Sequence, residues 1–393
     1  KFGAPIRIQG EVWGNYHDPG SIIAAGQLWV TNIAVRGETA DEASGRFALT
    51  NRVLTLSGVR IRAGTELLTA HRVVYDMDEQ SLTFTDTRGA MDIGRVTRAI
   101  GPKTARALLP YRFSKPPKVV LNGVLPTRGD TPMNARFEVE ASGFDWWRLH
   151  TTNTTGIVLA GTNSVTVSNL VAGFYGGQAA GDIWVDTAPA EGSIARFTLG
   201  FTNTEVRPLM ADLGFRTNRV DGRISGRLNI DSSLSWDPDS WFGHGHVTLT
   251  NGFLWDYPLF GVFTPVMDSI SPGWGQSRFT RGDAHFRVTN SVIRTADMVV
   301  YSPSMALRYD GLVDLQGRLD ATMEARLTSQ TPLFGPILSM AFFPVAKLME
   351  YKVTGTLGNP EIRPLYVPRF LLAPLHPLRT IRDLFGPDRS PPR

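Results

Sequence analysis

The feature of this sequence that most constrains its fold is a two-residue alternation of apolar and polar side chains. From residue 319 to residue 327 the alternation is unbroken, with apolar Leu319, Ala321, Met323, Ala325 and Leu327 separated by polar Asp320, Thr322, Glu324 and Arg326. Because successive side chains of a strand point to opposite faces, this segment is predicted to be a half-buried β-strand. One wet face is typical of antiparallel sheets, whereas strands of parallel sheets are apolar on both faces.

The same alternation recurs along the chain. Further copies lie at Phe47–Leu49, Val59–Ile61, Phe137–Val139, Phe197–Phe201, Ile224–Ile230 and Met305–Tyr309. The 39 glycines and 26 prolines, with many Thr and Asn residues, favour short strands joined by turns. We therefore predict an all-β-dominated fold, built as antiparallel repetitive meanders.

A Thr-Asn dipeptide also repeats loosely. Its copies are Thr31-Asn32, Thr50-Asn51, Thr162-Asn163, Thr202-Asn203, Thr250-Asn251 and Thr289-Asn290. Asparagine tolerates the left-handed backbone conformation and bonds its own backbone, so these dipeptides are predicted to form turns between strands. Such degenerate repetition is typical of an array of similar meanders rather than one closed globule.

Three segments have helical spacing instead. They run over residues 92–109, with a break at Gly101-Pro102, over residues 259–270, and from about Leu333 to Met349 with a kink near Pro344. The sequence thus adds a few short helices to the sheet.

The composition of the chain and the motifs it lacks exclude several classes of function. The chain of 393 residues has no cysteine, which excludes disulfides, thiolate metal sites and cysteine catalysis. Its formal charge of +4 is small, and no basic face suits a nucleic acid. Neither a Gly-x-Ser-x-Gly elbow nor a phosphate-binding loop is present. We predict a protein that is not an enzyme, has no cofactor and does not bind nucleic acid.

Two polar clusters are candidate sites. His244 and His246 would point to the same side of a strand and could share a metal, but no third ligand is placed, and paired surface histidines are the alternative. Asp237 and Asp239 could act as a carboxylate pair on a polysaccharide, and a turn cap is the alternative. We predict neither a metal site nor a catalytic site.

Aromatic residues are dense between Trp236 and Phe260. They are interpreted either as core or, in part, as the lining of a groove for acyl chains.

The predicted organisation has four parts: residues 1–118 and 119–219 as β-rich repeat regions, residues 220–365 as a C-terminal region, and residues 366–393 as a tail. The best linker candidate is Pro110–Pro117. The tail mixes arginines with apolar residues, which suits an anionic lipid surface or packing on its own domain. No uncharged run reaches the ~20 residues that cross a bilayer, and an anchor is expected before Lys1.

Several short sequence motifs follow one another in the second half of the chain. They are Val220–Leu228, Trp236–Ser240, Gly243–Gly252, Tyr257–Gly261, Asp310–Leu315, a strand opening at Leu319-Asp320, a proline-containing apolar helix, and Val353–Pro360. In this order they resemble the C-terminal region of AsmA-like proteins, the group that includes TamB and YhdP.

The resemblance implies a long, curved antiparallel sheet with a groove-like apolar face that holds or conducts phospholipid between the inner and outer membranes. It also implies a periplasmic, inner-membrane-anchored protein of the cell envelope, with an outer-membrane protein as a possible partner. The lining is predicted from the apolar sides of the alternating strands: Phe137, Val139, Phe197, Leu199, Phe201, Ile224, Leu228, Ile230, Met305, Leu307, Tyr309, Leu319, Met323 and Leu327. A non-enzymatic envelope scaffold with a filled interior and a polysaccharide-active β-scaffold enzyme are the alternatives.

Overall fold

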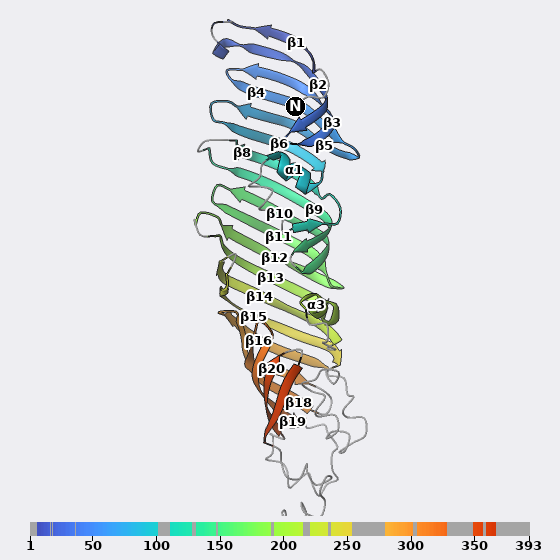
Figure 1. The fold of residues 1–393 in the computed structure, drawn as a ribbon, viewed down its shortest axis with the longest axis vertical. Helices are drawn as coiled ribbons and strands as arrows, with labels where there is room; N and C mark the ends of the chain where they lie inside the picture. Colours follow the sequence, from blue (N-terminus) through green and yellow to red (C-terminus); the bar gives the residue numbers. More distant parts are fainter. Residues whose placement is uncertain are drawn as a thin grey trace, which may run out of the picture. The chain divides into compact units, whose positions relative to one another are not determined.

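The computed structural model describes residues 6–366 except 16, 18, 36, 101–110, 128–130, 147, 190–191, 215–220, 235–236, 254–279, 302–304, 328–348 and 357–358. Its described strands form one open sheet of 21 strands, and every pairing with a determined register is antiparallel (Figure 1). The predicted fold class, an all-β-dominated antiparallel sheet with a few short helices, is confirmed.

The chain divides into two compact units, and the division runs through two strands. Unit 1 comprises residues 1–174 and 178–199, and unit 2 comprises residues 175–177 and 200–393. They share β13 (Ile194–Glu205), and Gly177, the first residue of β12, also belongs to unit 2. The four predicted part boundaries stay predictions.

Unit 1 holds the first twelve strands. They are β1 (Arg7–Trp13), β2 (Ile23–Val35), β3 (Glu38–Thr50), β4 (Val53–Ala63), β5 (Glu66–Asp76), β6 (Ser81–Ala90), β7 (Tyr111–Phe113), β8 (Lys118–Pro126), β9 (Asn134–Trp146), β10 (Leu149–Gly161), β11 (Ser164–Phe174) and β12 (Gly177–Asp186). Neighbours in sequence pair with one another, except that β6 pairs with β8 and the short β7 pairs with β9. The predicted linker residues Tyr111 and Phe113 therefore belong to the sheet.

Unit 2 continues in the same manner. Its strands are β14 (Asp221–Leu234), β15 (Asp237–Phe253), β16 (Arg281–Thr289), β17 (Val292–Tyr301), β18 (Met305–Asp314), β19 (Arg318–Leu327), β20 (Met349–Thr356) and β21 (Asn359–Tyr366). Each pairs antiparallel with the next.

The Thr-Asn repeats act in two ways. Asn51 and Asn290 have positive φ in hairpin turns, as predicted. Asn32 and Asn203 also have positive φ, but they lie inside β2 and β13, and Asn251 does the same in β15. At Asn251 the register with β14 shifts by one residue, which marks a β-bulge, a feature that bends a strand and increases its twist. At Asn32 the pairing of β2 with β3 keeps its register. The prediction that these dipeptides are turns is wrong at the three positions inside strands.

Side chains of the neighbouring strand satisfy the backbone at several such positions. The N–H of Asp86, which has φ of 48° within β6, donates to Asn122 Oδ1 of β8 at 2.7 Å. The N–H of Asn203 donates to Ser225 Oγ of β14 at 2.9 Å. Because a bulge leaves one N–H outside the ladder, these short polar side chains complete the hydrogen bonding where strands bend.

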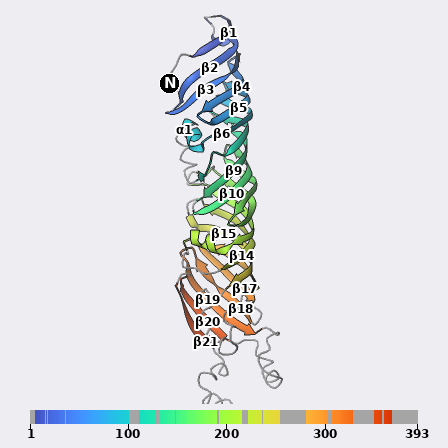
Figure 2. The same cartoon turned by 90° about the vertical axis from the view of Figure 1, so that its right-hand side faces the viewer.

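Helix α1 (Ile93–Ile100) lies within the predicted helix 92–109, and Asp92 starts it by accepting the N–H of Arg95 at 2.7 Å. Helix α1 lies beside the sheet near β5 and β6 (Figure 2). Three ion pairs hold it to the ends of β3 and β5: Arg98–Glu38 at 2.6 Å, Arg95–Glu66 at 3.3 Å and Arg95–Glu38 at 3.9 Å.

No helix is predicted from the sequence at the other two helical segments of the described residues. These are α3 (Val206–Asp212) and the single 3₁₀ turn η1 (Pro19–Ser21). Tyr175 Oη donates to Asp212 at 2.7 Å and fixes the end of α3. The helix predicted at residues 259–270 lies outside the described residues, as does that from Leu333 up to residue 348, whereas Met349 opens β20.

Candidate functional site

The register of unit 1 places apolar side chains on one face of the sheet. Phe137 of β9 lies directly opposite Leu121 of β8 and Val158 of β10. Val139 lies opposite Val119 on the same face. Because directly opposed residues of an antiparallel pair share a face, the two predicted lining residues of β9 belong to a continuous apolar row.

The row extends through β3, β4, β5 and β6. Alternation in the sequence predicts parts of the first two of these strands, Phe47–Leu49 and Val59–Ile61. Phe47 of β3 lies opposite Leu56 of β4, and Leu56 lies opposite Val73 of β5. Val73 in turn lies opposite Phe84 of β6. We call the side of the unit 1 sheet that carries Phe47, Leu56, Val73, Phe84, Leu121, Phe137, Val139 and Val158 the apolar face of unit 1.

This apolar face has little cover. All eight side chains that define it are half-buried. The buried apolar side chains that the structure describes in unit 1 are Val30, Pro117 and six alanines, namely Ala24, Ala63, Ala70, Ala135, Ala141 and Ala172. A sheet that packed on a second layer would bury its large side chains first, so this face still has apolar area to remove from water.

Unit 2 differs in how it fills its apolar face. Ile224 and Leu228 of β14 and Leu319 of β19 are half-buried, but Met323, Leu307 and Ile230 are exposed by only 0%, 3% and 2%. Their neighbours Val300, Tyr309, Tyr351 and Val353 are also buried. These predicted lining residues lie on the apolar side of the sheet, yet protein atoms already surround four of them: Ile230, Leu307, Tyr309 and Met323.

The remaining predicted lining residues lie on β13, β18 and β19. Phe197 and Leu199 belong to unit 1 and Phe201 to unit 2, and all three are half-buried. Phe201 lies across Gly226 of β14, because a Cβ on Gly226 would stand 3.0 Å from its ring. Met305 and Leu327 pair with each other across β18 and β19, and their side chains lie outside the described residues.

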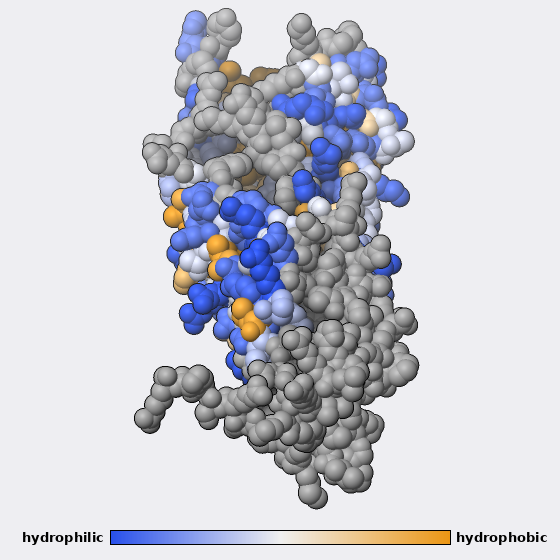
Figure 3. Space-filling view, turned by 60° about the horizontal axis from the view of Figure 1, so that its bottom comes forward, coloured by the Kyte–Doolittle hydropathy of each residue, from blue (hydrophilic) through white to orange (hydrophobic). Residues whose placement is uncertain are grey.

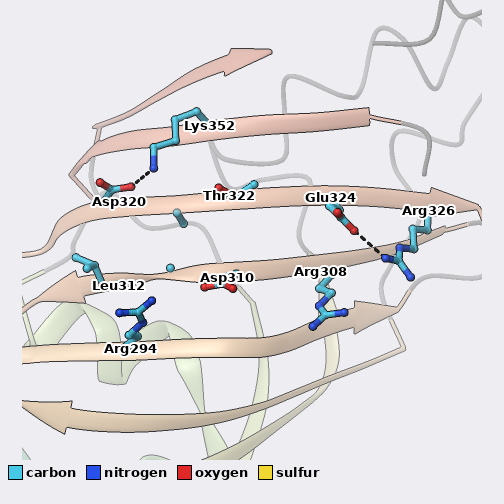
Figure 4. Close-up of a pocket in the computed structure, with 11 residues that line it drawn as sticks. Arg294, Arg308, Asp310, Leu312, Asp320, Thr322, Glu324, Arg326 and Lys352 are labelled. Atoms are coloured by element: carbon cyan, nitrogen blue, oxygen red, sulfur yellow. Dashed lines mark hydrogen bonds and ion pairs between the residues drawn. The ribbon is translucent and has the colours of Figure 1, made fainter. Parts of the chain in front are cut away.

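The opposite side of the sheet is polar. On the face drawn in Figure 3, hydrophilic side chains dominate the described surface and hydrophobic ones form isolated patches, with more hydrophobic atoms inside the hollow at the top of the view. In unit 2 a hollow of ≈ 580 Å³ is lined by charged residues of β17 to β20 (Figure 4). Lys352 pairs there with Asp320, and Arg326 with Glu324 at 2.8 Å.

A second hollow, of ≈ 800 Å³, lies in unit 1. Arg88, Lys118, Arg136, Glu138 and Glu140 line its rim, and three ion pairs use these charges: Arg88–Asp86, Lys118–Glu140 and Arg136–Glu138. Val120 and Ile157 provide apolar surface between them. Each positive side chain is paired with a carboxylate, so the charges balance and the hollow does not prefer an anion or a cation.

The two aspartates considered as a polysaccharide site, Asp237 and Asp239, take part in hydrogen bonds within their own turn. Asp237 Oδ1 accepts the N–H of Asp239 at 3.0 Å, and its carbonyl accepts the hydroxyl of Ser240 at 2.6 Å. Neither aspartate lines either hollow. This geometry favours the turn-cap interpretation.

His244 and His246 lie on the same side of β15, as predicted, and this is the polar side of the sheet. His244 pairs with Asp231 at 3.4 Å, and His246 lies directly opposite His285 of β16. His285 donates its backbone N–H and presents Nδ1 to the carboxylate of Asp297, at 2.9 Å and 2.8 Å. Burial alone would raise the pKa of Asp297, but these hydrogen bonds outweigh it and lower the pKa below its ordinary value. Within the described segments no three His, Asp or Glu side chains form a ligand set for a metal.

Of the helices that the structure describes, none is both long and apolar enough to cross a bilayer.

Comparison with known proteins identifies no relative of this chain. No protein-family model, no curated protein and no solved structure matches the chain.

Proposed function

We propose that the apolar face of unit 1 binds the acyl chains of lipids. The observation that carries the proposal is the half-buried state of Phe47, Leu56, Phe84 and Phe137, in a unit whose described buried apolar side chains are Val30, Pro117 and alanines. A face of this kind is stabilised when something apolar covers it, and burying one large apolar side chain contributes about 1.5–3 kcal/mol.

Hydrocarbon chains suit this face for a geometric reason. The apolar row runs from strand to strand through directly opposed residues, so it crosses β3, β4, β5 and β6 without a polar interruption at this level. Each methylene that leaves water contributes about 0.8 kcal/mol, wherever along the row it lies. A chain can therefore move along the row with little change in free energy, which suits holding or conducting lipid.

The location and relatives of the protein remain part of the proposal. The phrases from Val220 onward support an AsmA-like protein of a Gram-negative envelope that carries phospholipid and is not an enzyme. The buried stretch of unit 2 around Met323 supports a second role for that part, as a filled scaffold. On this proposal the lipid contacts lie mainly in unit 1 and on the half-buried residues of unit 2 such as Phe201 and Ile224.

Lipid extraction from the purified chain tests the proposal. Mass spectrometry of the extract is expected to show two-chain phospholipid in the wild type and a several-fold loss in Phe84→Asp and Phe137→Asp. Thr85→Asp is the matched control, because Thr85 is next to Phe84 on β6 but is exposed on the polar side, opposite Arg72. Circular dichroism verifies that each sample keeps its strands. A folded wild type without lipid, or equal lipid in all four samples, would refute the proposal.

A further inference from the structure

Two histidines that are distant in the sequence meet on the polar side of unit 2. His246 of β15 and His285 of β16 are direct partners in the antiparallel register. Their ring centroids are 6.1 Å apart, and their planes are inclined by 40°. Both side chains are exposed, His285 by 78%. The rings are therefore adjacent and open to solvent on the same face.

An acidic side chain orients one of the two rings. Asp297 of β17 holds Nδ1 of His285 at 2.8 Å and the backbone N–H of the same residue at 2.9 Å. With Nδ1 engaged as a donor, the lone pair of the imidazole is on Nε2. A carboxylate on the far nitrogen is the usual outer-shell partner of a metal-binding histidine, since it fixes the tautomer and makes the ligand more basic.

The spacing suits one shared ion. Imidazole nitrogens bind Zn²⁺ at about 2.0–2.1 Å, and two rings whose centres are about 6 Å apart can place one nitrogen each at that distance from a common point between them. Imidazole is a ligand for Zn²⁺, Cu²⁺ and Ni²⁺ rather than for Mg²⁺ or Ca²⁺, which prefer oxygen. Water would complete the coordination, because within the described part of the chain no third His, Asp or Glu converges with these two.

We propose that His246 and His285 form a two-histidine site for a divalent transition cation, with Asp297 as its orienting partner. A bound ion would join β15 to β16 by side-chain bonds in addition to the backbone ladder. The site lies on the polar side of the sheet and is independent of lipid binding on the apolar side.

Calorimetric titration of the full chain with CuCl₂ and ZnCl₂ tests the site. The wild type is expected to bind one ion per chain and to show a raised Tm with Zn²⁺, because an ion that binds only the folded state stabilises it. Asp297→Asn is expected to weaken binding by about tenfold or more, and His246→Ala and His285→Ala by a larger factor. The Cu²⁺ electron paramagnetic resonance spectrum should show nitrogen coupling that is reduced in both histidine variants.

Two matched variants locate the ion. His150→Ala in unit 1 removes a histidine that also pairs with an aspartate, Asp145 at 2.9 Å, and should leave binding unchanged. His244→Ala should do the same, because the direct partner of His244 on β16 is Arg287 rather than a histidine, and its Nδ1 faces Asp231 at 3.4 Å. Binding that survives His246→Ala and His285→Ala, or that His244→Ala abolishes, would overturn the assignment, as would equal binding of MgCl₂.

Discussion

Met323 of β19 lies directly opposite Tyr309 of β18, and both are buried, with exposed fractions of 0% and 7%. The pair lies on the apolar side of unit 2. Phe137 and Val158 form an equivalent opposed pair in unit 1, yet both are half-buried. The same strand pattern therefore produces a filled face at one position and an uncovered one at another.

Truncation separates these two states. Met323→Ala should lower the free energy of unfolding by about 2–5 kcal/mol, because it leaves a cavity in a packed region. Phe137→Ala should lower the free energy of unfolding by less per removed atom, because the Phe137 side chain is already partly exposed to solvent. Urea denaturation of both variants measures the difference. A loss below about 1 kcal/mol for Met323→Ala would show that its surroundings are not packed.

Gly245 provides a second test of packing. A Cβ at this position would stand 2.5 Å from the ring of Phe286 and 2.5 Å from the carbonyl oxygen of Arg227. Gly245→Ala should therefore destabilise the protein by about 1–3 kcal/mol, as overpacking does. Gly156→Ala is the control, because its Cβ would meet nothing closer than 3.7 Å. Thermal unfolding compares them, and an unchanged Tm in Gly245→Ala would contradict the contact.

The bulge at Asp86 gives a local prediction. Asn122→Ala removes the acceptor of the Asp86 N–H and should cost about 1 kcal/mol. Amide exchange at Asp86 should become faster while exchange in distant strands stays unchanged. Asn163→Ala is the control, since Asn163 accepts a hydrogen bond through its backbone carbonyl, from Thr187, which the substitution keeps. Equal exchange at Asp86 in wild type and Asn122→Ala would contradict the role of the side chain.

Asp314 links stability to pH. Burial alone would raise the pKa of Asp314, but hydrogen bonds from Arg318 and Gln316 outweigh it and lower the pKa below its ordinary value. A depressed pKa in the folded state means that the stabilisation is present above the unfolded pKa of about 3.9 and is lost as pH falls through the folded value. Asp314→Asn should therefore lower Tm at pH 7, with a gap to wild type that narrows below about pH 4. A gap that is constant over this range would contradict the assignment.

Period-two alternation predicted much of the fold because it depends only on which side of a strand each residue faces. Segments such as Leu319–Leu327 and Phe137–Val139 form strands, as predicted. The positive φ of Asn32 and Asn203 inside strands is not predictable from the sequence, because asparagine accepts this backbone conformation in turns and within strands alike. Helix α3 has only seven residues, too few for a periodic signal.

Alternation predicted the side of the sheet but not the degree of burial. Phe137 and Met323 both lie on apolar sides, and only the structure shows that one is half-buried and the other enclosed. The pairing of His246 with His285 depends on the register of two strands separated by a long segment. No local pattern contains that register, so the sequence alone pairs His246 only with its neighbour His244.

Photocrosslinking in cells tests the central claim, that acyl chains lie on the apolar face of unit 1, most directly. A benzophenone amino acid is placed at position 84, at position 137 or at position 85, and mass spectrometry identifies what each becomes attached to. The account predicts lipid adducts at positions 84 and 137 and none at the adjacent, outward position 85. Adducts absent from 84 and 137, or equally frequent at 85, would contradict it.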